Sequence, residues 1–269
     1  MARGPGLAHR LLIIRHVNSG SRTMNIATLV AGSRLVAQER SIEVTAVNLA
    51  NANTPGFQAM RMQFSDWLSP QQKGAALPGE RQIAYTQDRA TWRDQQPGTL
   101  TQTGNPFDLA LRGGGYFTVA TDHGPRLTRD GRFGPLPNGT LGDGNGNTLL
   151  DSNGKPLQIG PTDTIITITG DGAIASENGP LGKIGVVTPA DPGKMQAEGA
   201  TLWRADTPTS QTAQSGVVQG VVEGSNVNPV LELTRMMNDE RDYQFTTELV
   251  QAEDDRIQST IDKTLSTNT

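Results

Sequence analysis

Apolar residues recur at helical spacing near the beginning of the chain. From Met24 to about Ala50 one face carries Ile26, Leu29, Val30, Val36, Ala37, Val44 and Val47, at steps of three, four and seven. A second row, formed by Leu35, Ile42 and Leu49, lies on roughly the opposite side. A helix docked on a single core shows one apolar stripe, so two stripes predict contacts on two sides. The alternative is a helix buried within its own domain, but the chain has too little other helical sequence to surround it. Packing between molecules is therefore favoured.

A second long helix is predicted at the other end, from Pro229 to about Leu265. Its apolar residues repeat every seven positions, as in a coiled coil, at Met236, Tyr243, Val250 and Ile257. About 37 residues at a rise of about 1.5 Å give a helix of roughly 55 Å, longer than a domain of this composition needs. Thr247 and Asp254 interrupt the second row of the seam, so the pairing of two helices would need further neighbours.

The start of this helix is marked by capping residues. Either Ser225 or Asn228 can accept hydrogen bonds from the free N–H groups of the first turn. Pro229 suits the first helical position because it lacks an N–H group. Glu232 places a negative charge near the positive end of the helix dipole.

Between the two helices the pattern changes to short strands with glycine-containing turns. Residues 58–98 are polar and irregular, with a candidate strand at 83–92. From 99 to 216 the chain alternates or is rich in β-branched residues, and a polar connector runs to about Gln214. The expected strands are Phe107–Arg112, Tyr116–Val119, Ile165–Thr169 and Gly182–Thr188, followed by a last one at Val217–Glu223. The predicted fold class is α+β, with long N- and C-terminal helices forming a coiled-coil-like stem and a central antiparallel β-rich domain.

A sharp corner is predicted where the first helix ends. Asn48, Asn51 and Asn53 are poor residues for a helix interior, because their side chains compete for nearby backbone groups. Pro55-Gly56 fits the central pair of a type II turn, and Phe57 would pack to fix the direction in which the chain leaves. Local chemistry alone favours an ordinary helix end. The capped helix start near Asn228 gives this corner a counterpart at the far end of the chain.

Composition narrows the function classes. Hydrophobic residues make up 35% of the 269 residues and aromatic residues 4%, which indicates a thin core and surface that is buried only on assembly. The net charge of −4 provides no basic stripe for nucleic acid. With no cysteine there is no disulfide, thiolate nucleophile or cysteine metal site. No run approaches the ~18 apolar residues of a membrane span, so we expect no membrane insertion.

Candidate catalytic and metal-binding groups are few. A catalytic triad would require His123, which follows Asp122 in a Gly-Pro turn context and reads as a surface loop residue. The run from Asp143 to Asn147 has calcium-loop character but lacks the turn glycine and the bidentate glutamate, so a hairpin turn is favoured. We expect no catalytic residue, no cofactor and no metal. A hydrolase using His123 with Asp122, and a secreted β-rich binding module whose terminal helices pair within a monomer, remain alternatives.

Residues 1–23 differ from the rest of the chain. Two of the three histidines lie here, and the apolar run 11–14 is shorter than the ~7–15 residues of a secretory signal. We interpret the segment as a disordered leader or as the result of a start codon assigned too far upstream; a cleaved signal is the minor alternative. The expected organisation is a leader at 1–23, a helix and elbow at 24–57, a linker at 58–98, a β domain at 99–216, and a strand and helix at 217–269.

The chain carries four ordered motifs, and the first is Asn48-Leu-Ala-Asn-Ala-Asn-Thr-Pro-Gly-Phe57. This motif resembles the N-terminal signature of the flagellar axial proteins, the rod and hook components of the bacterial flagellum. Asp108-Leu-Ala-Leu-Arg-Gly-Gly-Gly-Tyr-Phe117 is similar to their strand-glycine-aromatic segment, and Leu127-Thr-Arg-Asp-Gly-Arg-Phe133 to Tyr-Thr-Arg-x-Gly-x-Phe, with leucine in place of tyrosine. Val222-Glu-Gly-Ser-Asn-Val-Asn-Pro229 and Arg241-Asp-Tyr243 resemble the C-terminal signature, where Asp242 replaces the common alanine. The resemblance covers nearly all of residues 24–269.

The resemblance implies a structural subunit of the flagellar basal-body rod that assembles through its terminal helices into a helical tube. A proximal rod subunit is favoured, with a distal rod or hook subunit as the alternative. Implied partners are further copies of the chain, other rod proteins and the flagellar export apparatus, and the implied location is a periplasm-spanning rod reached without a cleaved signal peptide. The residues expected to make assembly contacts are Asn48, Leu49, Asn51, Thr54, Pro55, Gly56, Phe57, Ser225, Asn226, Val227, Met236, Tyr243, Val250 and Ile257.

Overall fold

The computed structural model describes the backbone of residues 7–68, 84–212 and 216–266. Side chains are described from residue 28 to 63, except that of residue 29, and again from residue 91 onward within those ranges. The chain divides into two compact units, each assembled from segments that are distant in the sequence. The helix unit comprises Met1–Ala46, Met62–Thr91 and Leu233–Thr269, and the β unit comprises Val47–Arg61 and Trp92–Glu232.

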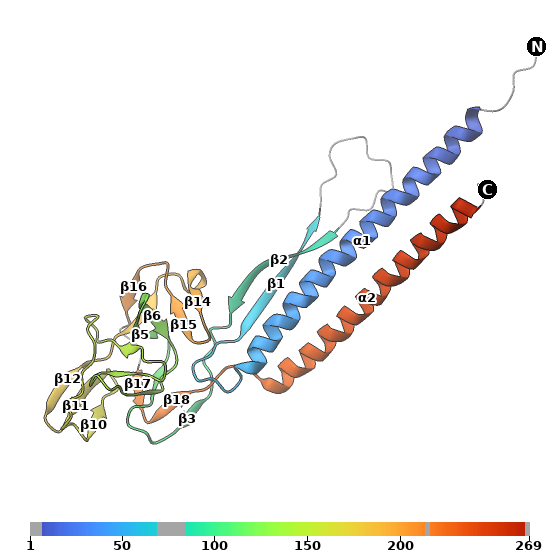
Figure 1. Ribbon diagram of the computed structural model, residues 1–269. Helices are drawn as coiled ribbons and strands as arrows, with labels where there is room; N and C mark the ends of the chain where they lie inside the picture. Colours follow the sequence, from blue (N-terminus) through green and yellow to red (C-terminus); the bar gives the residue numbers. More distant parts are fainter. Residues whose placement is uncertain (1–6, 69–83, 213–215, 267–269) are drawn as a thin grey trace, which may run out of the picture. The chain divides into compact units, whose positions relative to one another are not determined.

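The helix unit contains most of two long helices and of a pair of strands (Figure 1). Helix α1 spans Leu7–Ala50 and helix α2 spans Pro229–Ser266. The predicted ends at Ala50 and near Leu265 are thus confirmed, whereas α1 begins at Leu7 rather than at Met24. The helix therefore continues into the segment expected to be a leader, whose side chains lie outside the described residues.

Two paired strands occupy part of the segment that was expected to be irregular. They are β1, Met60–Leu68, and β2, Ala84–Arg93. β2 matches the candidate strand at 83–92. β1 was missed, although Met60, Met62 and Phe64 alternate with polar residues at the two-residue period of a strand.

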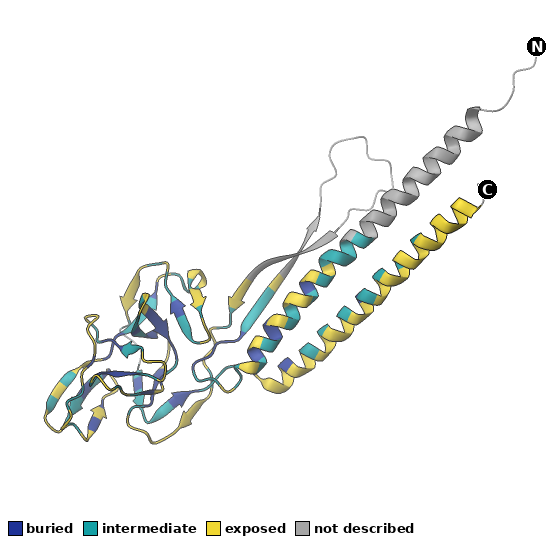
Figure 2. Cartoon of the chain, in the orientation of Figure 1, coloured by how far each residue is buried: buried dark blue, intermediate teal, exposed yellow. Residues whose placement is uncertain are grey.

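Helix α2 is exposed along most of its length (Figure 2). The four residues of its predicted heptad row, Met236, Tyr243, Val250 and Ile257, are half-buried. Several other large apolar side chains are exposed, including Phe245 at 70% and Leu249 at 57%. Neither this helix nor the described part of α1 is both long enough and apolar enough to cross a membrane.

The β unit is built from short antiparallel strands. Its main sheet has the order β14-β15-β6-β5-β9-β8-β7, and β13 pairs with both β5 and β16. Smaller sheets are formed by β10-β11-β12, by β17-β4 and by β18-β3. The strands are β3 Leu100–Gln102, β4 Leu109–Arg112, β5 Tyr116–Thr121, β6 Gly124–Thr128, β7 Phe133–Pro135, β8 Leu141–Asp143, β9 Thr148–Leu149, β10 Ile166–Ile168, β11 Ala173–Ser176, β12 Gly179–Lys183, β13 Val186–Pro189, β14 Gln196–Glu198, β15 Leu202–Arg204, β16 Thr209–Gln211, β17 Gly216–Gln219 and β18 Val221–Glu223, with a 3₁₀ turn at Pro192–Lys194.

The core of the β unit lies between these sheets. It contains one aromatic pair, Phe117 and Phe133, whose rings meet edge to face with centroids 5.4 Å apart. The other fully or largely buried members are aliphatic: Leu109, Leu111, Val119, Leu141, Leu149, Leu157, Ile166, Ile168, Ile174, Ile184 and Val217. The small number of aromatic residues in the sequence is thus matched by a core built mainly from branched aliphatic side chains.

The expected strands are present, with three differences. The strand expected at Gly182–Thr188 is divided between the end of β12 and the start of β13. The strand expected at Val217–Glu223 is divided into β17 and β18 at Gly220, whose φ of 73° interrupts the extended backbone. The polar connector expected before Gln214 contains β14, β15 and β16. The loop at Asp143 is a hairpin turn, as predicted, because its carboxylate accepts hydrogen bonds from the N–H groups of Asn145 and Asn147.

Candidate assembly junction

The last turn of α1 is tied to the chain that follows it by one asparagine. The Asn48 side chain accepts a hydrogen bond from the Met60 N–H at 2.7 Å and donates one to the Met60 carbonyl oxygen at 2.9 Å. Its amide thus binds both main-chain groups of one residue, as a neighbouring strand would. Asn48 is 1% exposed. Residues 49–59 therefore form a closed elbow between α1 and β1.

The turn within the elbow has the geometry predicted from Pro55-Gly56. Gly56 has a φ of 66°, and the Phe57 N–H donates to the Thr54 carbonyl oxygen at 3.3 Å. The Gly56 N–H donates to the carbonyl oxygen of Glu223 at 2.8 Å. A Cβ at this glycine would lie 2.3 Å or less from main-chain atoms of Arg129 and Asp130. The glycine is required both by the turn and by this close approach.

Phe57 fixes the exit from the elbow, as expected. It is 1% exposed and packs with Ala59 and Val227, with Ala52 alongside. Val227 comes from the segment just before α2, so this small apolar cluster connects the elbow with the last residues of the β unit.

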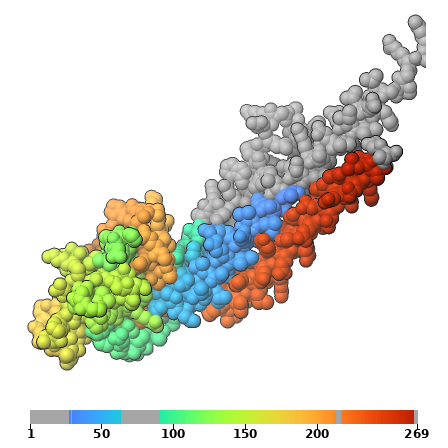
Figure 3. All heavy atoms as spheres, viewed as in Figure 1, coloured from blue at the N-terminus to red at the C-terminus, as the bar shows by residue number. Residues whose placement is uncertain are grey.

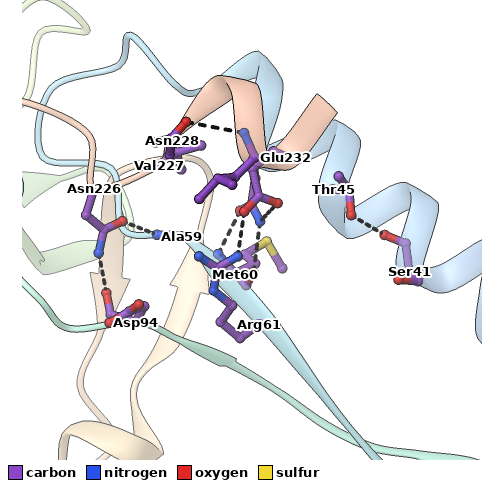
Figure 4. A network of polar contacts seen from close by, with 12 residues as sticks. Ser41, Thr45, Ala59, Met60, Arg61, Asp94, Asn226, Val227, Asn228 and Glu232 are labelled. Atoms are coloured by element: carbon purple, nitrogen blue, oxygen red, sulfur yellow. Dashed lines mark hydrogen bonds and ion pairs between the residues drawn. The ribbon is translucent and has the colours of Figure 1, made fainter. Parts of the chain in front are cut away.

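Asn226 connects three separate stretches of main chain. Its side-chain oxygen accepts from the Ala59 N–H at 2.7 Å, and its amide nitrogen donates to the carbonyl oxygens of Asp94 and Gln96 at 2.9 Å and 2.8 Å. Figure 4 shows the side chain between Ala59 and Asp94. Side-chain amides at 48 and 226 thus satisfy backbone groups that would otherwise lack partners.

The first turn of α2 is capped by Asn228. Its side-chain oxygen accepts from the N–H groups of Val230 and Leu231 at 3.1 Å and 3.2 Å. Of the two candidate caps, Asn228 is therefore the one used, while the Ser225 hydroxyl accepts from the Val227 N–H at 3.2 Å.

Glu232 is a buried charge in the same turn. Its side chain is 2% exposed and accepts a hydrogen bond from Arg61 at 2.7 Å (Figure 4). It also accepts one from Asn48 at 3.3 Å. A buried carboxylate needs such partners, because its desolvation is otherwise unfavourable. Glu232 therefore joins the beginning of α2 to the elbow and to β1 at Arg61.

Arg93 lies between two aromatic rings. Its guanidinium carbon is 4.8 Å from the ring centroid of Phe57 and 4.8 Å from that of Trp203. Its Nη1 donates to the carbonyl oxygens of Gln58 and Ala200, each at 3.1 Å. Burial lowers the pKa of Arg93 from its ordinary value. The arginine links the elbow to the loop between β14 and β15.

A second buried ion pair supports the elbow from the other side. Glu223, whose main chain holds Gly56, accepts hydrogen bonds on its side chain from Arg129 at 3.2 Å and from the Gly98 N–H at 3.1 Å. Burial raises the pKa of Glu223, and the positive charge of Arg129 opposes that rise. Arg129 also lies 5.5 Å from the ring centroid of Tyr116, and burial raises the pKa of that phenol.

The chemistry of this junction suits a rigid joint. Its charged groups are paired with each other or bound to main-chain atoms. Within the described residues no three His, Asp or Glu side chains are close enough to hold a metal ion. His123 is exposed in the turn between β5 and β6. The geometry holds the elbow, Arg61 and the first turn of α2 together within the β unit.

The structure brings some of the predicted residues together and leaves others apart. Asn48, Gly56, Phe57, Asn226 and Val227 converge on the elbow, and Ser225 is adjacent to them in the chain. Asn51 and Thr54 hydrogen-bond to each other at 3.2 Å, while Leu49 and Pro55 are half-buried. Met236, Tyr243, Val250 and Ile257 lie on α2 in the helix unit. Assembly contacts by these residues stay a prediction.

Sequence reasoning missed the charged members of the junction. These are Arg61, Arg93, Arg129 and Glu223, together with the burial of Glu232. Signals existed for Glu223, which lies inside the C-terminal motif, and for Arg129, which lies inside the motif at Leu127–Phe133. Arg61 follows Met60 and Arg93 follows Trp92, but an apolar neighbour in the sequence does not by itself indicate that an arginine is buried.

Two protein-family models match the segments of the chain that form the two sides of this junction. A family model described as "Flagella basal body rod protein" matches residues 29–58, and one described as "Flagellar basal body rod FlgEFG protein C-terminal" matches residues 218–263. The first range contains Asn48 and all of the elbow except Ala59, and the second contains Glu223, Asn226 and Glu232.

Similarity to individual proteins extends over most of the chain. The flagellar basal-body rod protein FlgF of Mesorhizobium japonicum is 35% identical over 231 residues, covering 84% of this chain and 92% of that protein. FlgF of Caulobacter vibrioides is 32% identical, covering 84% and 93%. The rod protein FlgG of Bacillus subtilis is 29% identical, covering 83% and 93%. The chain therefore belongs to the flagellar basal-body rod protein family and is a structural subunit of the basal body rather than an enzyme.

Proposed function

We propose that this subunit enters the rod through its two terminal helices, which form a coiled-coil-like stem that neighbouring subunits cover. The observation that carries the proposal is the set of large exposed apolar side chains along α2. Its members are Val230, Leu231, Leu233, Met237, Phe245, Leu249, Ile261 and Leu265, with exposures from 48% to 72%. Figure 3 shows the α2 side chains, orange to red, as an uncovered surface along the helix.

Such a surface is unfavourable in an isolated molecule. Each large apolar side chain transferred from water into an interface contributes about 1.5–3 kcal/mol. Contiguous exposed apolar surface is typical of interaction sites. Repeated contacts between different faces of identical or related subunits build an open helical tube rather than a closed ring, which is the form that a rod requires.

The other face of α2 supports the stem. Its heptad row is half-buried, and a hydrogen bond between the two helices in the helix unit joins Ser41 to Asp239 at 2.7 Å. Heptad spacing with one face less exposed is typical of paired helices. The helical stem would then have one face for its own partner helix and another for neighbouring subunits.

The junction holds the last turn of α1 and the first turn of α2 together within the β unit. Asn48, Asn226 and Glu232 bind main-chain and charged groups from several segments of that unit, so the elbow has few alternative conformations. In the rod, every copy would then present the same elbow to its neighbours.

We further propose the proximal part of the rod as the position of this subunit. The support is similarity: the FlgF proteins named above are 32–35% identical and the FlgG protein is 29% identical. A distal rod or hook position is the alternative. The proposed partners are other copies of the chain, other rod proteins and the flagellar export apparatus, with a periplasm-spanning location reached without signal cleavage.

Deletion of the coding region tests the proposal. The deletion strain is expected to be non-motile and to accumulate basal bodies with an incomplete rod, and the intact gene should restore motility. The position of the subunit in the rod is inferred from the rod proteins that remain in basal bodies purified from the deletion strain. Loss of a proximal subunit should leave fewer of them than loss of a distal one. A motile deletion strain would rule out the proposed role.

A further inference from the structure

The less exposed face of α2 carries two rows with opposite character. One is the apolar row of half-buried residues at Met236, Tyr243, Val250 and Ile257. The other is polar, also repeats every seven residues, and is buried or half-buried: Glu232, Asp239, Thr246 and Glu253. Polar residues on the seam of a helix pair weaken it unless they are satisfied, so the second row requires an explanation.

Two members of the polar row are bound by residues of α1. In the helix unit, the Ser41 hydroxyl donates to the Asp239 carboxylate at 2.7 Å. In the β unit, the Asn48 amide donates to the Glu232 carboxylate at 3.3 Å. Ser41 lies seven residues before Asn48, and Asp239 lies seven residues after Glu232. Because α1 and α2 run in opposite directions (Figure 1), both bonds belong to the same antiparallel register.

The apolar residues do not select that register by themselves. On α1, Val30, Ala37 and Val44 are also spaced by seven, and Ala37 and Val44 are each 7% exposed. A slip of one heptad, about 10 Å along the axis, would place apolar residues against apolar residues again. It would break both hydrogen bonds to the carboxylates.

We propose that Ser41 and Asp239 are the residues that hold the register of α1 against α2 beyond the elbow. The inference rests on the stem proposed above and names the contact that determines its alignment. A hydrogen bond to a charged acceptor in a half-buried seam discriminates strongly, because the slipped state leaves the carboxylate without this donor. The polar row would thus select the register of the two helices, and the apolar row would stabilise their pairing.

Cysteine pairs can report the register, because the chain contains no cysteine of its own. The aligned pair is Ala37→Cys with Tyr243→Cys, four residues from Ser41 and Asp239 on each helix. The slipped pair is Ala37→Cys with Val250→Cys, one heptad further along α2. Both pairs are made in the full-length purified protein with Ser41 and Asp239 intact, and crosslinking by the short thiol reagent dibromobimane is measured on the intramolecular product.

The aligned pair is expected to crosslink at least about tenfold faster than the slipped pair, because one hydrogen bond to a charged group is enough to separate two states by about that factor. Adding Asp239→Leu should reduce this ratio several-fold, and Ser41→Ala should have a similar effect, while the bond between Asn48 and Glu232 still favours the aligned pair. Asp242→Leu, which removes an exposed carboxylate of the same helix, should leave the ratio unchanged.

An unchanged ratio in both the Asp239→Leu and Ser41→Ala proteins would overturn the inference, as would faster crosslinking of the slipped pair in the parent. Circular dichroism of each variant shows whether the helices remain folded. Motility of the Asp239→Leu strain separates this inference from the proposed function. Lost register preference with full motility would support the register role and contradict its connection to rod assembly.

Discussion

The Gly56 nitrogen lies 2.8 Å from the carbonyl oxygen of Glu223, and this approach depends on the absence of a side chain. Gly56→Val adds a β-branched residue in the left-handed region, which is unfavourable by about 1–3 kcal/mol, and places Cβ against the main chain of Arg129 and Asp130. We expect the elbow to leave its site and motility to be lost. Thermal unfolding should still show a folded β core.

Gly104→Val is the matched control. Gly104 has a φ of 75°, but a Cβ there would meet no atom within 4 Å. This variant has the same backbone strain without the steric overlap, so it should remain motile. Normal motility of the Gly56→Val strain would show that the elbow is an ordinary turn with no role in assembly.

Asn226→Ala tests the main-chain connections made by one side chain. The substitution removes the hydrogen bonds to Ala59, Asp94 and Gln96. Leaving such groups unpaired should lower the free energy of unfolding by about 1–3 kcal/mol, as measured by urea denaturation. Asn53→Ala, in an exposed position of the same elbow, should change it by less than about 0.5 kcal/mol. Equal effects of the two substitutions would show that the role assigned to Asn226 is wrong.

Glu177 provides a pH-dependent prediction in the β unit. The Thr164 N–H, the Thr164 hydroxyl and the Ile165 N–H donate to its carboxylate. These bonds, the one from the Thr164 N–H first, lower the pKa of Glu177 to about 2 from the ordinary 4.5. The pKa of Glu177 is lower in the folded than in the unfolded protein. Its contribution to stability is therefore complete above about pH 4.5 and is lost as the pH falls through about 2.

Glu177→Gln removes the charge and should destabilise the β unit at pH 7. The difference in unfolding free energy between the parent and the variant should shrink toward zero near pH 2, where the parent carboxyl is protonated as well. Thermal melts at both pH values measure it. A difference that is independent of pH would contradict the assignment.

At the scale of elements, α2 is the helix that the structure leaves uncovered. Phe245 is 70% exposed, so Phe245→Ser should change the unfolding free energy of the purified chain by less than about 0.5 kcal/mol. In an interface the same change would remove about 1.5–3 kcal/mol of apolar burial. We expect reduced incorporation into basal bodies, measured by immunoblot.

Gln244→Ser is the control for that substitution, since it changes an exposed polar neighbour on the same helix. It should incorporate normally. If the Phe245→Ser protein incorporates as well as the control, that part of α2 is not an assembly surface.

The elements differ in how well the sequence predicts them. The end of α1 and the start of α2 follow from local residues, namely the asparagines with Pro55-Gly56 and Asn228 with Pro229. Strands rich in β-branched residues, such as β10, can also be predicted from their own residues. The short polar strands β14 to β16 are not, because they are defined by pairing: β15 becomes a strand by pairing with β6.

The junction was predictable only in its local part. Its asparagines, glycine and phenylalanine have recognisable turn chemistry. The burial of Arg61 and Glu232 depends on a contact across 171 residues of sequence, and the residues next to each one do not identify its partner. Buried contacts between residues that are distant in the sequence could therefore not be predicted.

At the scale of the whole molecule, the two units draw on alternating parts of the chain. The β unit takes Val47–Arg61 and Trp92–Glu232, and its core is independent of α2 beyond Glu232. A chain that stops after Arg235 should therefore keep a cooperatively folded β unit and fail to restore motility to a deletion strain. Hydrogen exchange of the β5 amides measures the first effect. Rapid exchange of those amides would show that α2 is required for the β unit to fold.

The stacking of Arg93 on Trp203 has a practical consequence. The emission of an indole depends on the charge and polarity around it, and Trp203 is 4% exposed with a guanidinium 4.8 Å from its ring centroid. The same guanidinium faces Phe57 of the elbow. Once Trp67 and Trp92 are replaced by phenylalanine, the fluorescence of Trp203 becomes a built-in optical probe of the elbow, able to follow its state in real time while subunits join a growing rod.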